Sequence, residues 1–433
     1  MVIVESHKEW KRFIKEFQKY NSIVIPVQCD ENKHPLDTEL CLLYVKLLDG
    51  GLEEYVLPFR HSDAINLKYK YIKMTSTERD VFTYNKKKLL HLVKWENITD
   101  MQMHYYMSKN EPLPIDEITT NAHEYFYRTH YKTKNINCVI PMMKHIEWCR
   151  KLVDHLKLTV FVKPAGHSVF KIYNDDVIGN LQYIEQSGLQ TTNGMVYSEY
   201  NPYTATGRPS NRFGGMNFAA LNKKDGSRKQ FISRFGKDGM LVEMDYDAYH
   251  LRLIGDVLGY KFPKGSVHKH MAKFYGVGYE ESKGLSFQYL YGHIPDNVLK
   301  KNPFFKKVQV YIDSLWSDYK TTNFIKSDIY NKTIRKENLS DMNKNKLFNY
   351  LIQLTETESN MRMLTELIPK IDGYKSKLIL YSYDSFLFDF YMPDGLNFIH
   401  KVKKIIEQSG KFPVKVGKGW NYHEMKDITE KFN

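Results

Sequence analysis

Two apolar stretches in the second half of the chain each lead to an aspartate. Leu241 to Arg252, LVEMDYDAYHLR, begins as an apolar strand, reaches Asp245 and continues at once as an amphipathic helix. Leu378 to Tyr383, LILYSY, brings Asp384 to a tight turn before FLFDFYM returns as another strand. Short apolar runs bounded by turn residues are typical of buried strands. The pattern therefore predicts two strand ends that each present a carboxylate.

The first 112 residues have a different pattern. An amphipathic helix, ESHKEWKRFIKEF, precedes three apolar runs, IVIPVQC, LCLLYVKLL and EEYVLPF, at the spacing of consecutive strands. This order predicts an α/β unit. From about Ile115 to Asn180 the sequence becomes helical and basic, which suits either contact with duplex phosphates or a solvated helix face.

One predicted helix carries a cation on an otherwise apolar face. The stretch from Tyr279 to Gly292, YEESKGLSFQYLYG, is expected to be helical and to end at the glycine. Lys283, Phe287 and Tyr291 recur every four residues and therefore share a face. A core stripe is the alternative, but an unpaired ammonium is costly in a core, so the lysine favours a functional face.

Composition narrows the class of protein. A chain of 433 residues, with 42% hydrophobic and 14% aromatic residues, predicts a globular protein of two or three packed subdomains. The 63 Lys and Arg exceed the 50 Asp and Glu, giving a net charge of +13. This charge suits a polyanionic partner, although it equally serves solubility or contact with an anionic membrane surface.

The cysteines and the N-terminus point to a cytoplasmic protein. The four cysteines, Cys29, Cys41, Cys138 and Cys149, show no CxxC pairing and no zinc-type spacing to histidine, so we expect reduced core residues. The N-terminus lacks the apolar region of a signal peptide, and no apolar run of about 18 residues occurs. No membrane association is expected.

Paired carboxylates at strand ends have a specific chemical use. Two such groups can bridge a pair of Mg²⁺ ions about 3.5–4 Å apart, the arrangement of metal-assisted nucleotidyl transfer. The alternative is that each aspartate is only a turn residue, since aspartate is common at strand ends. The motifs around the two aspartates decide between these interpretations.

Four motifs resemble those of family A DNA polymerases. DYDAYHLR resembles the family's motif A, DYSQIELR, and YDS at Asp384 resembles its motif C, HDE. SKGLSFQYLYG resembles motif B, KxxxFxxxYG, and TATGRPS is nearly the family's TATGRLS. They occur in the family's order between about Leu189 and Trp420, and an ordered set is more specific than any single motif. The chain thus resembles a small, phage-type family A DNA polymerase.

The resemblance implies an α+β, right-hand fold: an antiparallel palm sheet, helical fingers and thumb, and an N-terminal α/β exonuclease-like domain. The corresponding divisions are residues 1–112 (exonuclease-like), 113–188 (thumb-like), 189–255 (palm with motif A), 256–346 (fingers with motif B) and 347–433 (palm with motif C). The implied reaction adds deoxynucleotides from dNTPs to a primer 3′-OH in phage DNA replication, in the host cytoplasm. The implied partners are a DNA primer-template, dNTPs and processivity or replisome subunits.

The resemblance also implies roles for individual residues and two Mg²⁺ ions, with Mn²⁺ as an alternative. One ion would lower the pKa of the 3′-OH and the other would hold the triphosphate. The implied catalytic residues are Asp245, Asp384 and Lys283; the metal ligands are Asp245, Asp384 and the backbone carbonyl of Tyr246. The implied nucleotide-binding residues are Tyr246, His250, His268, Phe287 and Tyr291, and the DNA-binding residues are Arg208, Asn217, Arg335, Asn349 and Gln353.

The chain departs from the family at several positions. Tyr279 replaces the arginine that grips the nucleotide phosphates, His250 replaces the glutamate that blocks a 2′-hydroxyl, and Ser385 replaces the motif C glutamate. In the exonuclease-like domain Asp30, Asn85 and Asp100 match motif positions, but Asn32 and Leu89 stand where carboxylates are needed. A two-metal hydrolase needs those carboxylates, so no proofreading is expected.

Two other functions stay open on the sequence. A single-subunit RNA polymerase has HDS as motif C, which matches YDS better than HDE does, although TATGRPS argues against that class. A catalytically lapsed nucleic-acid-binding subunit is the second alternative. The retained Asp245, Asp384 and Lys283 argue against it.

Overall fold

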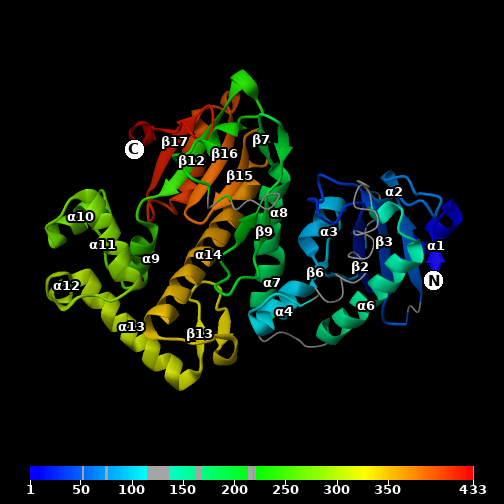
Figure 1. Ribbon diagram of the computed structural model, residues 1–433, viewed down its shortest axis with the longest axis horizontal. Helices are drawn as coiled ribbons and strands as arrows, with labels where there is room; N and C mark the ends of the chain where they lie inside the picture. The colour runs from blue at the N-terminus through cyan, green and yellow to red at the C-terminus, as the bar shows by residue number, and fades with distance from the viewer. Residues whose placement is uncertain are drawn as a thin grey trace. The chain divides into compact units, whose positions relative to one another are not determined.

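The structure is a computed structural model that describes residues 1–50, 53–73, 77–114, 136–160, 167–212, 218 and 221–432. The chain forms two compact units, Met1–Gln186 and Ser187–Asn433, shown in Figure 1. The five-part division implied by the resemblance stays a prediction. Among the described residues, no helix combines the length and the apolar character needed to cross a bilayer.

The first unit is built on a mixed sheet. Its six strands have the order β1-β4-β3-β2-β5-β6, in which β2 pairs antiparallel with β3 and parallel with β5. The strands are β1 (Val2–Ile3), β2 (Ser22–Gln28), β3 (Leu40–Leu47), β4 (Glu54–Pro58), β5 (Val81–Thr83) and β6 (Ile98–Asp100). The predicted helix and the three strands that follow it are confirmed.

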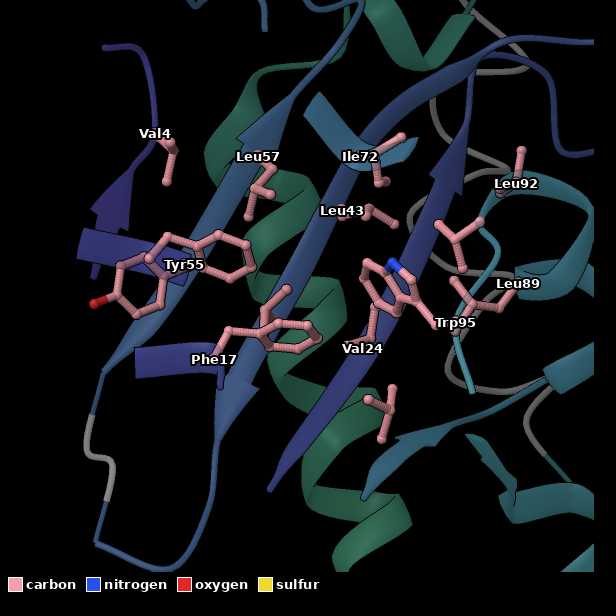
Figure 2. Close-up of a cluster of buried hydrophobic side chains, with 14 of the residues drawn as sticks. Val4, Phe17, Val24, Leu43, Tyr55, Leu57, Ile72, Leu89, Leu92 and Trp95 are labelled. Atoms are coloured by element: carbon pink, nitrogen blue, oxygen red, sulfur yellow. The ribbon is translucent and has the colours of Figure 1, made fainter. Parts of the chain in front are cut away.

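Both faces of this sheet are buried, which explains why its central strands are continuous apolar runs. Successive residues of β2 point to opposite faces, so Val24 packs with helix α1 (His7–Phe17) while Ile23 and Ile25 pack with helix α6 (Met142–Val160). Figure 2 shows the core on the α1 side. A capping box between Ser6 and Glu9 starts α1.

Shorter helices complete the first unit: α2 (Lys70–Lys73), α3 (Lys86–Leu92), α4 (Met101–Lys109), α7 (His167–Ile172) and α8 (Ile178–Ser187), with a π-helical turn at Tyr173–Val177 between the last two. Asn85 and Asp100 are the N-caps of α3 and α4, and Leu89 is fully buried in the core. These positions, singled out by the exonuclease-like motifs, therefore have structural uses.

The second unit contains an antiparallel sheet. The two strands that were predicted to lead to Asp245 and Asp384 are both part of it. Its strand order is β15-β16-β12-β17-β18. The strands are β12 (Gly239–Tyr246), β15 (Lys377–Ser382), β16 (Ser385–Tyr391), β17 (Val414–Gly419) and β18 (Lys426–Asp427). Three small sheets accompany it, made of β7 (Leu189–Thr191), β8 (Gly194–Val196) and β11 (Phe231–Ile232); β9 (Glu199–Asn201) and β10 (Ser210–Arg212); and β13 (Phe324–Lys326) and β14 (Thr333–Arg335).

Helices α9 to α14 form an apolar cluster in the second unit (Figure 1). They are α9 (Tyr249–Val257), α10 (Val267–Tyr275), α11 (Tyr279–Tyr291), α12 (Asp296–Lys301), α13 (Pro303–Thr322) and α14 (Lys344–Ile371); α15 (Leu396–Ile406) follows motif C. The long helix α14 contacts α9, α11, α13 and α15. The predicted helix from Tyr279 is confirmed, and it ends at Gly292, where a Cβ would lie 2.8 Å from the carbonyl oxygen of Gln288.

Candidate active site

A cavity of about 400 Å³ lies in the second unit where β12, β17, α9, α11 and α14 meet. Of the residues predicted from the motifs, those that line it are Arg208, Asp245, Tyr246, His250, His268, Lys283, Phe287, Tyr291 and Asp384. They come from five separate segments of the chain. The fold thus gathers most of the predicted site around one cavity.

Asp245 and Asp384 lie on neighbouring strands. Asp245 pairs with Ser385 in the β12–β16 register, and the amide of Tyr246 donates to the carbonyl of Asp384 at 2.9 Å. Asp384 follows Tyr383, which has a positive φ of 62° in the two-residue turn between β15 and β16. Such a conformation is costly for a bulky residue and is held here by Asn360, whose amide donates to the Tyr383 carbonyl at 2.7 Å.

The environment of the two aspartates opposes their ionisation. Burial raises the pKa of Asp245 to about 7, with further contributions from the charges of Asp384 and Glu243. Burial and the charge of Glu356 also raise the pKa of Asp384 above its ordinary value. Two neighbouring carboxylates whose ionised forms are disfavoured suit a divalent cation, because the cation favours those ionised forms.

Although Ser385 replaces the motif C glutamate, another carboxylate, that of Glu243, lies beside it. The hydroxyl of Ser385 donates to Oε1 of Glu243 at 2.9 Å, and the hydroxyl of Tyr422 donates to the same oxygen at 2.8 Å. Glu243 therefore supplies a third carboxylate close to Asp245, from β12 rather than from motif C. Its ordinary place within a strand gave no sequence signal.

Helix α11 presents the predicted face to the cavity. Lys283 is exposed, whereas Phe287 and Tyr291 are half-buried and stack with their ring centroids 6.1 Å apart. The residues that α11 buries are Ser282, Ser286 and Leu290, which lie on another face. The Lys283 face therefore borders the cavity, although Tyr291 also packs against the apolar cluster of α9 to α14. The functional use of this face stays a prediction. His268 of α10 lies beside Phe287, at 5.8 Å between ring centroids.

A buried glutamate that sequence reasoning missed connects three of the site's side chains. Glu356 is fully buried on α14; its carboxylate lies 2.8 Å from Nε of Arg208 and 3.0 Å from Nε2 of His250. The other ring nitrogen of His250 contacts the hydroxyl of Tyr291. Burial alone raises the pKa of Glu356, but the contacts with His250 and Arg208 outweigh it and hold the pKa below the ordinary value.

Two lysines that the motifs did not predict also line the cavity. They are Lys223 and Lys415, and the positive charge of each lowers the pKa of Asp245, against the effect of burial. Lys415 pairs with Asp245 across β12 and β17, and its Nζ is 3.4 Å from a carboxylate oxygen of Asp247. Tyr279 interacts electrostatically with Lys415, so a cation lies beside the position where the family's arginine is missing.

The predicted DNA-binding residues are not all at the cavity. Arg208 stacks over the ring of Tyr383 at 3.7 Å and reaches Glu356. Asn349 donates to the Tyr291 carbonyl at 3.2 Å, and Gln353 lies one turn further along α14. Neither they nor Arg335, which is exposed on β14, are among the described residues that line the cavity. Asn217 lies outside the described residues.

Comparison with solved structures identifies the fold. The structure is similar to that of the "POL domain of Pol1 from M. smegmatis complex with DNA primer-template and dNTP", with a TM-score of 0.69 at 11% sequence identity. The similarity covers 98% of this chain and 100% of that chain. The fold is that of a DNA polymerase domain. No family model matches the sequence, and no curated protein does.

Proposed function

We propose that this protein is a template-directed DNA polymerase that adds deoxynucleotides to a primer 3′-OH and releases pyrophosphate. The observation that carries the proposal is the pairing of Asp245 and Asp384 at one cavity with Lys283 on the facing helix, in a chain with a polymerase fold. The primer-template and dNTP named for the similar structure are the partners that we assign to this chain.

The donor set fits Mg²⁺, which prefers carboxylate and carbonyl oxygens. Asp245, Asp384 and the backbone carbonyl of Tyr246 would hold the metal, with Mn²⁺ as a substitute. When bound, the metal supplies charge stabilisation and lowers the pKa of the attacking hydroxyl. The raised pKa values of both aspartates support this assignment, because a cation compensates the repulsion between them.

The lysines act on the triphosphate. Lys283, exposed at the cavity, would neutralise the leaving pyrophosphate and donate a proton to it. We assign to Lys415 the phosphate-gripping role that Tyr279 cannot perform, since both side chains face the same cavity. Phe287 and Tyr291 would pack against the sugar and base of the incoming nucleotide. The ring of His268 packs against that of Phe287.

Arg208 and residues on α14 would position the nucleic acid. Arg208 is held by Glu356 and Tyr383 next to the cavity, the place expected for contact with the primer terminus. Asn349 and Gln353 are one helical turn apart on α14, and Arg335 is exposed on β14, so all three would contact the duplex. Contacts of Arg208 and Arg335 with phosphates would make DNA binding depend strongly on salt.

Primer extension with the purified chain, dNTPs and Mg²⁺ tests the proposal. We expect Asp245→Asn and Asp384→Asn to abolish extension while leaving primer-template affinity nearly unchanged, because basic residues supply that affinity. The matched control is Asp313→Asn, which should retain activity. Asp313 is on α13, and it forms an exposed ion pair with Lys344 at the start of α14. Extension above about a tenth of the wild-type rate in either site variant would contradict a two-metal mechanism.

The same assay separates the alternatives. Efficient use of NTPs by the wild type would support the RNA polymerase alternative, which the YDS motif favours. Binding of primer-template with no extension under any divalent metal would support the lapsed-subunit alternative. A role in phage replication is part of the proposal and rests on the motif resemblance alone.

A further inference from the structure

A second cluster of reactive side chains lies within the first unit. The Sγ atoms of Cys29, Cys41 and Cys138 are all within 4.8 Å of one another, and those of Cys29 and Cys138 are 2.8 Å apart. All three residues are buried, and none is in a disulfide. Their spacing along the chain has no zinc-type pattern, so only the fold brings them together. The cysteines are free core residues, as expected, and the fold brings three of them into one cluster.

Backbone hydrogen bonds hold these cysteines in place, and the thiol of Cys41 also donates to the carbonyl of Asn137 at 3.5 Å. The amide of Cys29, just after β2, donates to the Glu39 carbonyl at 2.8 Å, and the Cys29 carbonyl accepts from the amide of Asn137 at 3.3 Å. The Cys138 carbonyl accepts from the amide of Ser62 at 2.9 Å. Cys41 is in β3, between β2 and β4. The three thiols thus converge from a scaffold that is already formed.

Two histidines lie next to the sulfur of Cys41. One ring nitrogen each of His61 and His145 lies within 4.8 Å of the Cys41 sulfur. Nε2 of His145 is 2.8 Å from the carbonyl oxygen of Asn137, which can only accept, so Nε2 carries the proton and Nδ1 keeps a lone pair. An imidazole anchored to a backbone carbonyl in this way is typical of metal ligands. Nδ1 of His61 instead accepts from the Asp63 amide at 3.0 Å.

We propose that Cys29, Cys41, Cys138 and His145 form a structural zinc site. Three thiolates and one imidazole are a common tetrahedral zinc set, and with Zn–S near 2.3 Å the sulfurs lie roughly 3.8 Å apart. Here the sulfurs of Cys29 and Cys138 are 2.8 Å apart and the other sulfur pairs are within 4.8 Å, so binding requires these side chains and the His145 ring to turn toward the ion. Burial of all four residues leaves no open position for a substrate, so the role is structural. Binding one Zn²⁺ releases the three thiol protons to solvent.

The other group of metal-ligating residues in this unit is different. His34, His91 and Glu185 also converge, with Nε2 of His91 2.8 Å from the carboxylate of Glu185. The ammonium of Lys87 forms an ion pair with the same carboxylate. A cation is therefore already present at Glu185, and it occupies the carboxylate that a metal ion would need.

Metal analysis of the full chain, purified under reducing conditions without a metal-binding tag, tests the site. We expect about one zinc per chain, and after exchange for Co²⁺ we expect the thiolate-to-cobalt charge-transfer absorption of a tetrahedral site. Cys138→Ser and His145→Ala should each lose the metal. Cys149→Ser is the matched control, because Cys149 is a buried cysteine of the same core outside the cluster.

Several outcomes would overturn the proposal. One is a wild-type chain that takes up neither zinc nor cobalt; another is a Cys29–Cys138 disulfide in peptide mapping of alkylated protein. Zinc retained by His145→Ala would overturn the assignment of that ligand. If Cys138→Ser fails to fold, the wild type decides, since a zinc chelator must then lower its Tm. None of these measurements depends on polymerase activity.

Discussion

The raised pKa of a carboxylate in the cavity makes the folded protein's stability and its affinity for a cation depend on pH. Asp245 is half-buried, and desolvation together with the charges of two other carboxylates raises its pKa to about 7. Because this value exceeds the ordinary carboxyl value of about 3.9, the folded state binds a proton that the unfolded state has lost between those pH values. The contribution to stability is therefore fully present at low pH and is lost as the pH rises through about 7.

This titration gives a pH prediction. Without metal, the free energy of unfolding should fall as the pH rises from about 4 to 7, and Asp245→Asn should remove much of that dependence. The apparent affinity for Mg²⁺ should fall about tenfold for each pH unit below 7, because the metal needs the ionised carboxylate. Denaturant unfolding and Mg²⁺-titrated primer extension at several pH values measure the two effects. An Mg²⁺ requirement that does not change between pH 5.5 and about 8 would contradict this reasoning.

The sugar preference should depend on His250. Its ring is held between Glu356 and Tyr291 and is bulky enough to exclude a 2′-hydroxyl, so we expect a preference for dNTPs. Selectivity from one lost hydrogen bond is only about tenfold, whereas steric exclusion in a packed site exceeds that. His250→Ala should therefore lower the dNTP/NTP ratio of kcat/KM by more than about tenfold.

Glu356→Gln keeps the shape of the side chain and serves as the control for His250→Ala. If size decides, the dNTP/NTP ratio of Glu356→Gln should stay within about tenfold of the wild type, even where KM rises. A larger fall in Glu356→Gln than in His250→Ala would mean that hydrogen bonding through the imidazole, rather than its size, sets the preference. Circular dichroism shows whether the variant is folded, since Arg208 loses its charged partner.

At the scale of elements, strand β17 and helix α11 place cations on the cavity. Lys415 of β17 faces Asp247 and lies near Tyr279, so its loss should weaken dNTP binding. We expect Lys415→Ala to raise the KM for dNTPs about tenfold, roughly the loss of one charge-assisted phosphate contact, with a smaller effect on kcat. Lys418→Ala, a charge loss on the same strand outside the cavity lining, is the control. Steady-state extension kinetics would refute the role if the two variants behaved alike.

The elements that sequence patterns predicted are those that local rules decide. The strands that lead to Asp245 and Asp384 and the bounds of α11 follow from apolar runs, turn residues and a terminal glycine. Glu356 and Lys415 were not predicted, because their positions depend on how α14 packs and on the register between β12 and β17. The cysteine cluster was missed for the same reason. Side chains from distant segments meet only when the tertiary fold is known.

The whole molecule has two units with separate cores, and only one of them carries the predicted site. In the first unit Leu89 is fully buried, and Asp100 accepts from the amides of Met103 and Lys86, both at 2.7 Å. An aspartate engaged by backbone amides and a leucine in the core do not supply the carboxylates of a two-metal hydrolase.

We therefore predict that the purified protein does not shorten a 3′-mismatched primer in Mg²⁺ or Mn²⁺. A gel assay with matched and mismatched primers, without dNTPs, measures this. Degradation that disappeared with Asp30→Ala would show that the first unit is an active exonuclease. Degradation that survived Asp30→Ala would instead indicate a contaminating nuclease.

Helix α11 is attached to different elements at its two ends, and near its start the hydroxyl of Ser282 donates to the carbonyl of His268 on α10 at 2.9 Å. At Tyr291 the hydroxyl contacts His250 and the carbonyl accepts from Asn349, and Gly292 follows directly. Lys283 is eight residues earlier on the same helix, a separation of about 12 Å at 1.5 Å per residue. If α11 tilts by about 20° about Tyr291, with α10 moving along with it, the backbone of Lys283 moves through roughly 4 Å. A small angular change at Tyr291 is therefore enough to move the lysine by about the width of a phosphate group.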